Sequence, residues 1–205
     1  MNVTIVPQTA ELRWITPNAA QEIELAGRTC YRSEDKITNE SAVKFVEMIC
    51  ASGHESVLEH ASASIQITTD RGITHEIVRH RIGCSFSQES SRYVGYHKKL
   101  GLLVVEPLDI SPLTRQIWLD QMQDAANCYE RLIAEGWKPQ QARDVLPTCT
   151  AAQIRFTATF RAWKHFIKLR SSKAAHPKIQ VLTGLISDIL HRECPAVFKS
   201  QAGSP

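Results

Sequence analysis

The sequence lacks the cysteine pattern of a disulfide-bonded or zinc-binding protein. Its six cysteines include no C-x-x-C pair and follow no regular spacing (Cys30, Cys50, Cys84, Cys128, Cys149 and Cys194). Residues 1–11 contain no basic segment followed by a long apolar run, and no stretch approaches the roughly 20 apolar residues of a membrane span. We therefore expect reduced thiols, no signal peptide, no metal and a cytoplasmic protein.

A strong excess of charge of one sign is also missing. The net charge is only +3 over 205 residues, and charged residues make up 22% of the chain. Binding of an anion must then come from local clusters of basic residues and not from a basic field over the whole surface. This argues against a general nucleic-acid-binding protein.

Three common catalytic or nucleotide-binding motifs are absent. No G-x-G-x-x-G follows a predicted strand, and neither G-x-x-x-x-G-K-[ST] nor G-x-S-x-G occurs. No cysteine is followed by a clear general base. A Rossmann dinucleotide site, a P-loop and a serine or cysteine nucleophile are therefore not indicated.

What is present is an α/β (α+β) pattern of strands and helices. Period-two alternation predicts strands at residues 1–6, 12–15, 61–68, 102–105 and 151–159, and apolar spacing of three or four predicts helices at residues 18–28, 42–49, 73–81, 112–136, 138–145, 160–170 and 177–194. Residues 82–91 contain a glycine and many hydroxyl side chains and predict a loop. We expect residues 1–205 to form a single domain, mainly helical at about 111–145, with a frayed tail after about residue 199.

The most informative segment is residues 74–93, T-H-E-I-V-R-H-R-I-G-C-S-F-S-Q-E-S-S-R-Y. It places Arg79, His80 and Arg81 side by side and ends in a hydroxyl-rich run that leads to Arg92. Guanidinium groups bind phosphate with two parallel hydrogen bonds, and serine and glutamine add donors. The segment is either a solvated basic helix end or a phosphate-binding site.

Two other groups carry candidate ligand-binding residues. The H-E-x-x-x-E-H run at residues 54–60 lacks metalloprotease spacing, and we interpret it as either a capped helix start or a ligand-binding turn that presents Ser56 and Glu59. Arg143, Arg161 and Arg170 each lie near a predicted helix end, where arginines commonly cap carbonyls. With Arg79 and Arg92 they indicate a phosphorylated, planar ligand, and the residues alone do not identify the reaction.

The same segments resemble the flavin-dependent thymidylate synthase (ThyX) family, whose signature is R-H-R, seven residues, then serine. The resemblance includes Arg79-His80-Arg81 and residues 87–93, and it continues through residues 53–60, 143–147, 160–170 and 174–180. The matches occur in order and cover roughly residues 20–195.

This resemblance implies a ThyX-like fold with a central mixed or antiparallel sheet flanked by helices, in a homotetramer with active sites at subunit interfaces. It implies a methyltransferase that converts dUMP to dTMP, with FAD as cofactor and with NADPH and methylenetetrahydrofolate as co-substrates. No cysteine nucleophile is required. It assigns Arg170 a catalytic role at the uracil ring. The FAD contacts would be Ser56, Arg79, His80, Arg81, Gln88, Thr159, Phe160, Arg161 and His165. The dUMP contacts would be Glu76, Ile77, Val78, Arg79, Gln88, Glu89, Ser90, Ser91, Arg92, Arg143 and Arg170.

Three positions depart from the family pattern. Eight residues, not seven, separate Arg81 from Ser90, and residues 83–85 are where we place the extra one. Glu76 stands where glutamine is frequent, and Thr159 stands where asparagine is frequent. Glu76 leaves open a related enzyme that methylates or hydroxymethylates another pyrimidine nucleotide such as UMP. A nucleic-acid-binding module that uses the arginine cluster is the alternative from another class, although only Phe86 and Tyr93 lie near the cluster to stack on bases.

Overall fold

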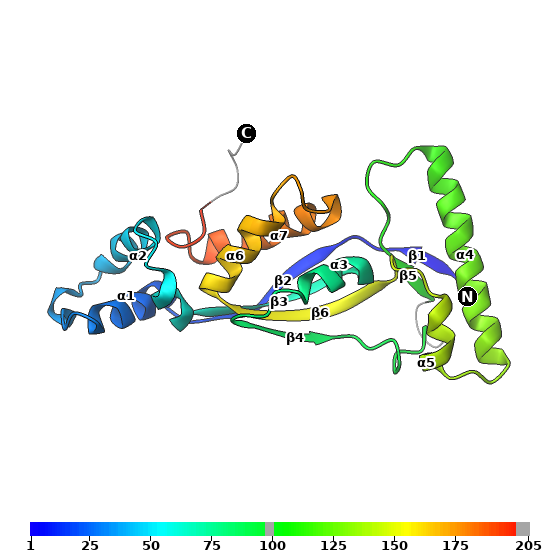
Figure 1. Ribbon diagram of the computed structural model, residues 1–205, viewed down its shortest axis with the longest axis horizontal. Helices are drawn as coiled ribbons and strands as arrows, with labels where there is room; N and C mark the ends of the chain where they lie inside the picture. Colours follow the sequence, from blue (N-terminus) through cyan, green and yellow to red (C-terminus); the bar gives the residue numbers. More distant parts are fainter. Residues whose placement is uncertain (97–100, 200–205) are drawn as a thin grey trace. The chain divides into compact units, whose positions relative to one another are not determined.

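A computed structural model describes residues 1–96 and 101–199, so the expected frayed tail after residue 199 lies outside the described residues. Figure 1 labels the helices and strands along the chain. Contacts group the chain into two compact units. Unit 1 comprises Met1–Thr9, Ile67–Arg79 and Ser87–Ile154, and unit 2 comprises Ala10–Gln66, His80–Phe86 and Arg155–Pro205. Whether they act as the single domain expected from the sequence stays a prediction.

The α/β class is confirmed by an antiparallel sheet with flanking helices. Four strands lie in the order β2-β3-β6-β4, with β2 at Thr9–Ile15, β3 at Ser62–Asp70, β6 at Ala151–Thr159 and β4 at Cys84–Gln88. The short strands β1 (Val3–Ile5) and β5 (Leu102–Val104) form a separate parallel pair. Ile65 and Ile67 of β3 and Ile154 and Phe156 of β6 are fully buried, as their period-two spacing predicts.

In unit 2, the helix α6 (Phe160–Arg170) packs on the sheet through aromatic side chains. The Trp163 and Phe156 ring centroids lie 4.2 Å apart, and the Trp163 indole N–H donates to the Ala63 carbonyl at 3.1 Å. Both α6 and the strand β6 before it have the predicted bounds, because β6 alternates and α6 has a threonine cap followed by apolar residues three and four apart. The helix α7 (Pro177–Glu193) begins at the predicted proline.

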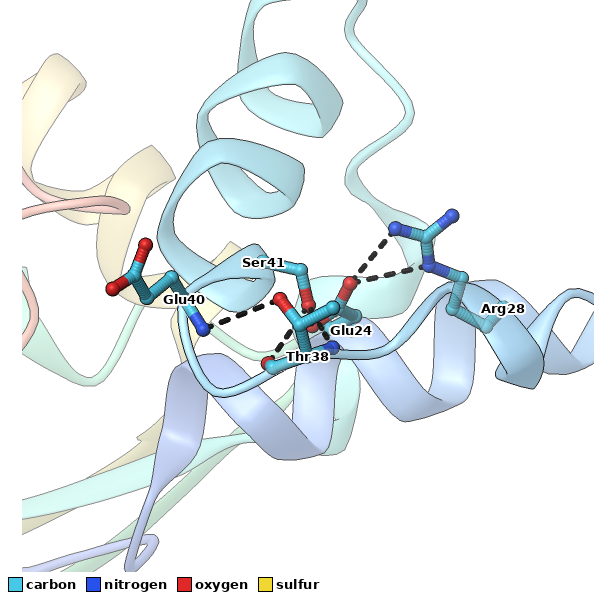
Figure 2. A network of polar contacts seen from close by, with 5 residues as sticks. All are labelled: Glu24, Arg28, Thr38, Glu40 and Ser41. Carbon is cyan, nitrogen blue, oxygen red and sulfur yellow. Dashed lines mark hydrogen bonds and ion pairs between the residues drawn. The ribbon is translucent and has the colours of Figure 1, made fainter.

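The remaining helices of unit 2 are α1 (Ala19–Thr29) and α2 (Ser41–Ala51), which are joined by a buried carboxylate (Figure 2). Glu24 of α1 is 1% exposed and accepts from Arg28 at 2.9 and 3.1 Å and from the Ser41 hydroxyl at 2.7 Å. The Arg28 guanidinium also lies 4.7 Å from the Phe45 ring centroid of α2. The carboxylate is therefore paired and fully hydrogen-bonded, which a buried charge requires. Short 3₁₀ turns follow each helix, η1 (Glu34–Lys36) and η2 (Glu55–His60).

In unit 1, the long helix α4 (Pro112–Ala134) buries one face in a small core. The Ser111 hydroxyl accepts from the Thr114 N–H at 3.2 Å, so Ser111 caps the helix directly before Pro112. The buried core residues are Leu102, Val104, Met122 and Ala126. The short helix α5 (Pro139–Ala142) and the turn η4 (Arg143–Val145) replace the single helix expected at residues 138–145.

Two expectations about the central segment are wrong. The helix α3 (Arg71–Ile77) ends before the three basic residues, so Arg79, His80 and Arg81 lie in the turn that follows it and not on its last turn. The predicted loop at residues 82–91 contains the edge strand β4, because backbone pairing with β6 at the sheet edge overrides the weak strand preference of its serines. No helix among residues 1–96 and 101–199 is both long and apolar enough to cross a membrane.

Candidate functional site: two arginine-containing clusters

Unit 1 holds a cavity of about 330 Å³ beside the start of α3. It brings together two of the predicted dUMP contacts, Ser91 and Arg143, and the Arg143 guanidinium donates to the Ser91 hydroxyl at 3.2 Å. Ser91 is buried, so this hydrogen bond fixes the guanidinium at the cavity wall. The cavity is completed by residues of α3, of η4 and of the segment that follows η4 (Arg71, His75, Asp144, Leu146, Pro147 and Thr148).

Arg71 and His75 are cavity residues that the sequence analysis missed. The Arg71 Nη1 atom is buried and has no hydrogen-bond partner among the described residues. An unpaired buried guanidinium nitrogen is costly, which is expected where an anionic ligand supplies the partner. The signal that could have found the pair is their spacing of four on one helix, Arg71 to His75.

The backbone around α3 holds Arg71 in place. The Asp70 carboxylate caps the helix by accepting from the Ile73 N–H at 2.8 Å. The Arg71 and Gly72 N–H groups donate to the Thr150 and Thr148 carbonyls at 3.0 and 3.1 Å. The start of α3 is therefore tied to the loop that forms the opposite wall of the cavity.

The other predicted nucleotide residues of unit 1 are held individually, and none of them is among the residues that line the cavity. The Gln88 amide donates to the buried Thr74 hydroxyl of α3 at 3.0 Å. The Glu89 carboxylate accepts from the Gln153 N–H at 3.3 Å, so it points to the sheet edge. Arg92 is exposed, and its guanidinium lies 5.5 Å from the Tyr93 ring centroid. Of the rest, Ile77 is buried, Glu76, Val78 and Ser90 are half-buried, and Arg79 is exposed.

Unit 2 holds the second cluster, in which His80 contacts α6. The Arg170 Nε–H donates to the His80 Nε2 atom at 3.0 Å, although 90 residues separate the two in the sequence. The His80 ring lies edge-on to Phe166 at 4.9 Å and to His165 at 5.9 Å between centroids. Arg170 and two of the predicted flavin residues therefore form one connected group.

The imidazole of His80 is held in its neutral form. Burial, the positive charge of Arg170 and the nearby His165 together lower its pKa to about 4, and burial is the largest of these causes. Because Nε2 accepts the hydrogen bond from Arg170, the neutral ring carries its proton on Nδ1. His80 therefore orients the Arg170 guanidinium without adding a second positive charge.

The start of α6 is fixed by Thr159. Its hydroxyl accepts from the Ala162 N–H at 3.3 Å, and its own N–H donates to the Gly83 carbonyl at 3.0 Å. Gly83 has a φ of +69°, and a Cβ at this position would lie 2.9 Å from the Thr159 hydroxyl oxygen. Glycine is thus required where the eight-residue segment turns toward β4. Phe160 is fully buried, and its ring packs edge-on to Phe198 at 5.0 Å.

Most of the other predicted flavin residues have exposed side chains that can donate hydrogen bonds. Ser56, Arg81, Arg161 and His165 are exposed. The Arg161 guanidinium pairs with the Glu59 carboxylate of η2 at 2.7 Å, and both side chains are about half exposed. Such a pair contributes only about 0–1 kcal/mol, so a ligand phosphate can replace it at little cost. Within residues 1–96 and 101–199, no group of three or more His, Cys, Asp and Glu side chains is arranged to hold a metal ion.

The fold and the two clusters define an α/β protein with arginine-rich sites suited to phosphorylated ligands. The family model described as thymidylate synthase complementing protein matches residues 11–196. The chain is similar to flavin-dependent thymidylate synthases of several bacteria. It is 33% identical to the one from Corynebacterium diphtheriae, covering 90% of this chain and 81% of the relative. It is 33% identical to the one from Geobacter sulfurreducens, with 90% and 82% covered, and 37% identical to the one from Mycobacterium avium, with 86% and 77% covered.

The chain therefore belongs to the flavin-dependent thymidylate synthase family, as its R-H-R segment had indicated.

Proposed function

We propose that the protein is a methyltransferase that converts dUMP to dTMP by reductive methylation. Methylenetetrahydrofolate would supply the carbon that replaces the hydrogen at C5 of the uracil ring. Bound FAD, once reduced by NADPH, would supply the hydride that takes this carbon to the methyl level. Membership of the family supports this proposal, and so does the presence of both arginine-containing clusters.

The observation that carries the nucleotide part of the proposal is the buried, unpartnered Arg71 nitrogen in a cavity shared with Arg143. We assign this cavity to the phosphate group of dUMP, with Ser91 and His75 as further donors. Two guanidinium groups supply forked donors that match phosphate geometry better than lysine does. Arg92 and Ser90 would add donors from the adjoining turn.

The donor set of unit 2 suits a flavin dinucleotide. Exposed Arg81, Arg161 and His165 offer cationic or N–H groups for its diphosphate, and Ser56 and Thr159 offer hydroxyls. We propose that Arg79 and Gln88 contribute to both ligands. The buried His80 and Phe160 would shape the wall of the site, because their rings pack on Phe166 and Phe198.

We propose a catalytic role for Arg170. A guanidinium that is already oriented stabilises negative charge developing on the uracil ring without reorganising during the reaction. The hydrogen bond to neutral His80 supplies that orientation. The assembly proposed for this activity is a cytoplasmic homotetramer with its active sites at subunit interfaces.

The visible absorbance spectrum of the purified protein tests the flavin part of this proposal. We expect a yellow protein with oxidised-flavin bands that shift when dUMP is added and bleach when NADPH is added anaerobically. A colourless protein that neither binds added FAD nor oxidises NADPH would rule the proposal out.

A further inference from the structure

Unit 2 contains a second cavity whose lining residues include none of those assigned to dUMP or FAD. Its volume is about 480 Å³, within the range of roughly 300–1,000 Å³ that is typical of small-molecule sites. The walls come from the end of α2, one face of α6, α7 and the segment after α7. The lining residues are Glu47, Cys50, Ala51, Lys164, Ile167, Lys168, Ser171, Ser172, Ser187, Val197, Phe198 and Lys199.

The charge in this cavity is positive. Three lysines line it against a single glutamate, Glu47. Lys164 is already paired with the Glu55 carboxylate at 2.5 Å. Lys168 and Lys199 are exposed, and neither forms an ion pair with another residue in the ranges 1–96 and 101–199. Two ammonium groups are therefore open to an anion that enters the cavity.

The arrangement of donors follows from the helical repeat of α6. Lys164, Lys168 and Ser171 recur at spacings of four and three, so they lie on one face of the helix. Ser171 and Ser172 provide hydroxyl donors at the end of that face. Ammonium and hydroxyl donors together match the several acceptor oxygens of a phosphate group.

The floor of the cavity is apolar. Ile167, Val197 and Phe198 line it and are 6%, 4% and 3% exposed. A free inorganic anion would leave this floor in contact with water, whereas an attached ring or chain would cover it.

We propose that this cavity binds a phosphorylated small molecule that carries an apolar ring or chain. Lys168 and Lys199 bind the phosphate, and Ile167, Val197 and Phe198 contact the apolar part. The proposal does not depend on the reaction proposed above, because binding in this cavity can be measured without turnover.

Cys50 provides a reporter for this test because its thiol lines the cavity. Burial raises the pKa of the thiol, so alkylation should be followed above neutral pH, where more thiolate forms. The holoenzyme is saturated with FAD and dUMP so that the arginine-containing clusters are occupied. N-ethylmaleimide labelling of Cys50 is then followed by peptide mass spectrometry with phenyl phosphate, inorganic phosphate or sodium chloride at equal ionic strength.

We expect phenyl phosphate to slow alkylation of Cys50 about tenfold at about ten times its dissociation constant, because labelling follows the fraction of empty sites. Inorganic phosphate should protect less at the same concentration. Protection equal to that of sodium chloride would overturn the proposal, and equal protection by phenyl phosphate and inorganic phosphate would overturn the organic part of the ligand.

The variant Lys168→Glu/Lys199→Glu identifies the groups responsible. Phenyl phosphate should no longer slow alkylation in this variant, measured against the variant's own rate without phosphate. Lys36→Glu, an exposed lysine of η1 outside the cavity, makes the same type of substitution at a single position and should keep full protection. Unchanged protection in the double variant would overturn the proposal. Flavin absorbance and dTMP formation, measured in parallel, should be retained in both variants.

Discussion

At the scale of single residues, the pair formed by Arg170 and His80 is the most specific feature of unit 2. The guanidinium is positioned by an imidazole whose low pKa keeps it neutral at every pH near 7. A protonated His80 would lose the acceptor atom and would repel Arg170. The orientation of the Arg170 guanidinium therefore depends on the protonation state of His80, which changes only well below physiological pH.

Replacement of Arg170 by alanine tests both parts of this link. Arg170→Ala should abolish dTMP formation while FAD remains bound. The His80 pKa should also rise from about 4 toward its ordinary value of 6.5, because one of the charges that lower it is gone. Imidazole NMR titration measures this shift, and Lys173→Ala serves as an exposed control from the segment after α6. Turnover like that of the wild type, or an unchanged His80 pKa, would contradict the assigned role.

Arg71 is the second residue whose role can be tested alone. Arg71→Ala should weaken dUMP binding by roughly tenfold to a hundredfold, since a hydrogen bond to a charged group is worth about 1.5–3 kcal/mol. Binding of deoxyuridine, which has no phosphate, should change little. Titration of the flavin spectrum with each compound measures the difference, and exposed Arg131→Ala on α4 is the control. Equal losses for dUMP and deoxyuridine would show that Arg71 does not contact the phosphate.

At the scale of elements, the turn at Gly83 connects the basic segment to β4 and to the start of α6. The positive φ costs a non-glycine residue roughly 1–2 kcal/mol at such a position. Gly53 provides a matched comparison, because its φ is +71° and nothing lies within 4 Å of an added Cβ.

We predict that Gly83→Ala lowers the free energy of unfolding by more than Gly53→Ala does. Both variants carry the conformational cost, but only Gly83→Ala forces a contact with the Thr159 hydroxyl at 2.9 Å. Urea unfolding of the two variants gives the difference directly. Equal losses of stability would show that the segment relaxes without strain at the start of α6.

The joint between α1 and α2 depends on the buried Glu24. Glu24→Ala should cost about 3–5 kcal/mol, because it leaves the Arg28 guanidinium without its carboxylate in a partly buried place. Exposed Glu22→Ala on the same helix should cost less than about 0.5 kcal/mol. Thermal or urea unfolding measures the free energy of unfolding of both variants. A small loss of stability in Glu24→Ala would mean that water replaces the carboxylate as the partner of Arg28.

At the scale of the whole molecule, the sequence predicted elements where a regular pattern coincided with buried packing. The bounds of β6 and α6 were correct because period-two alternation ends where apolar spacing of three and four begins. The edge strand β4 was missed, since its pairing with β6 depends on residues about 65 positions away, as the Glu89 N–H to Gln153 carbonyl bond shows. The strand propensities of the β4 residues do not depend on this distant partner, so they could not predict the pairing.

For the candidate site, too, the sequence predicted some features and missed others. The R-H-R motif and the family resemblance supplied Arg143, Ser91, His80 and Arg170, but not which of them touch. The hydrogen bond from Arg170 to His80 and the burial of the Arg71 Nη1 atom arise only when distant segments fold together. The cavity lined by Lys168 and Lys199 had no motif at all, because its lysines come from α6 and from the end of the described chain.

The most direct test of the proposed reaction is tritium release from dUMP labelled at C5. With FAD bound and NADPH and methylenetetrahydrofolate present, the purified protein should release tritium and form dTMP, and it should not do so with UMP or when either NADPH or methylenetetrahydrofolate is omitted. No release from dUMP by a protein that carries flavin, or equal release from UMP, would contradict the account.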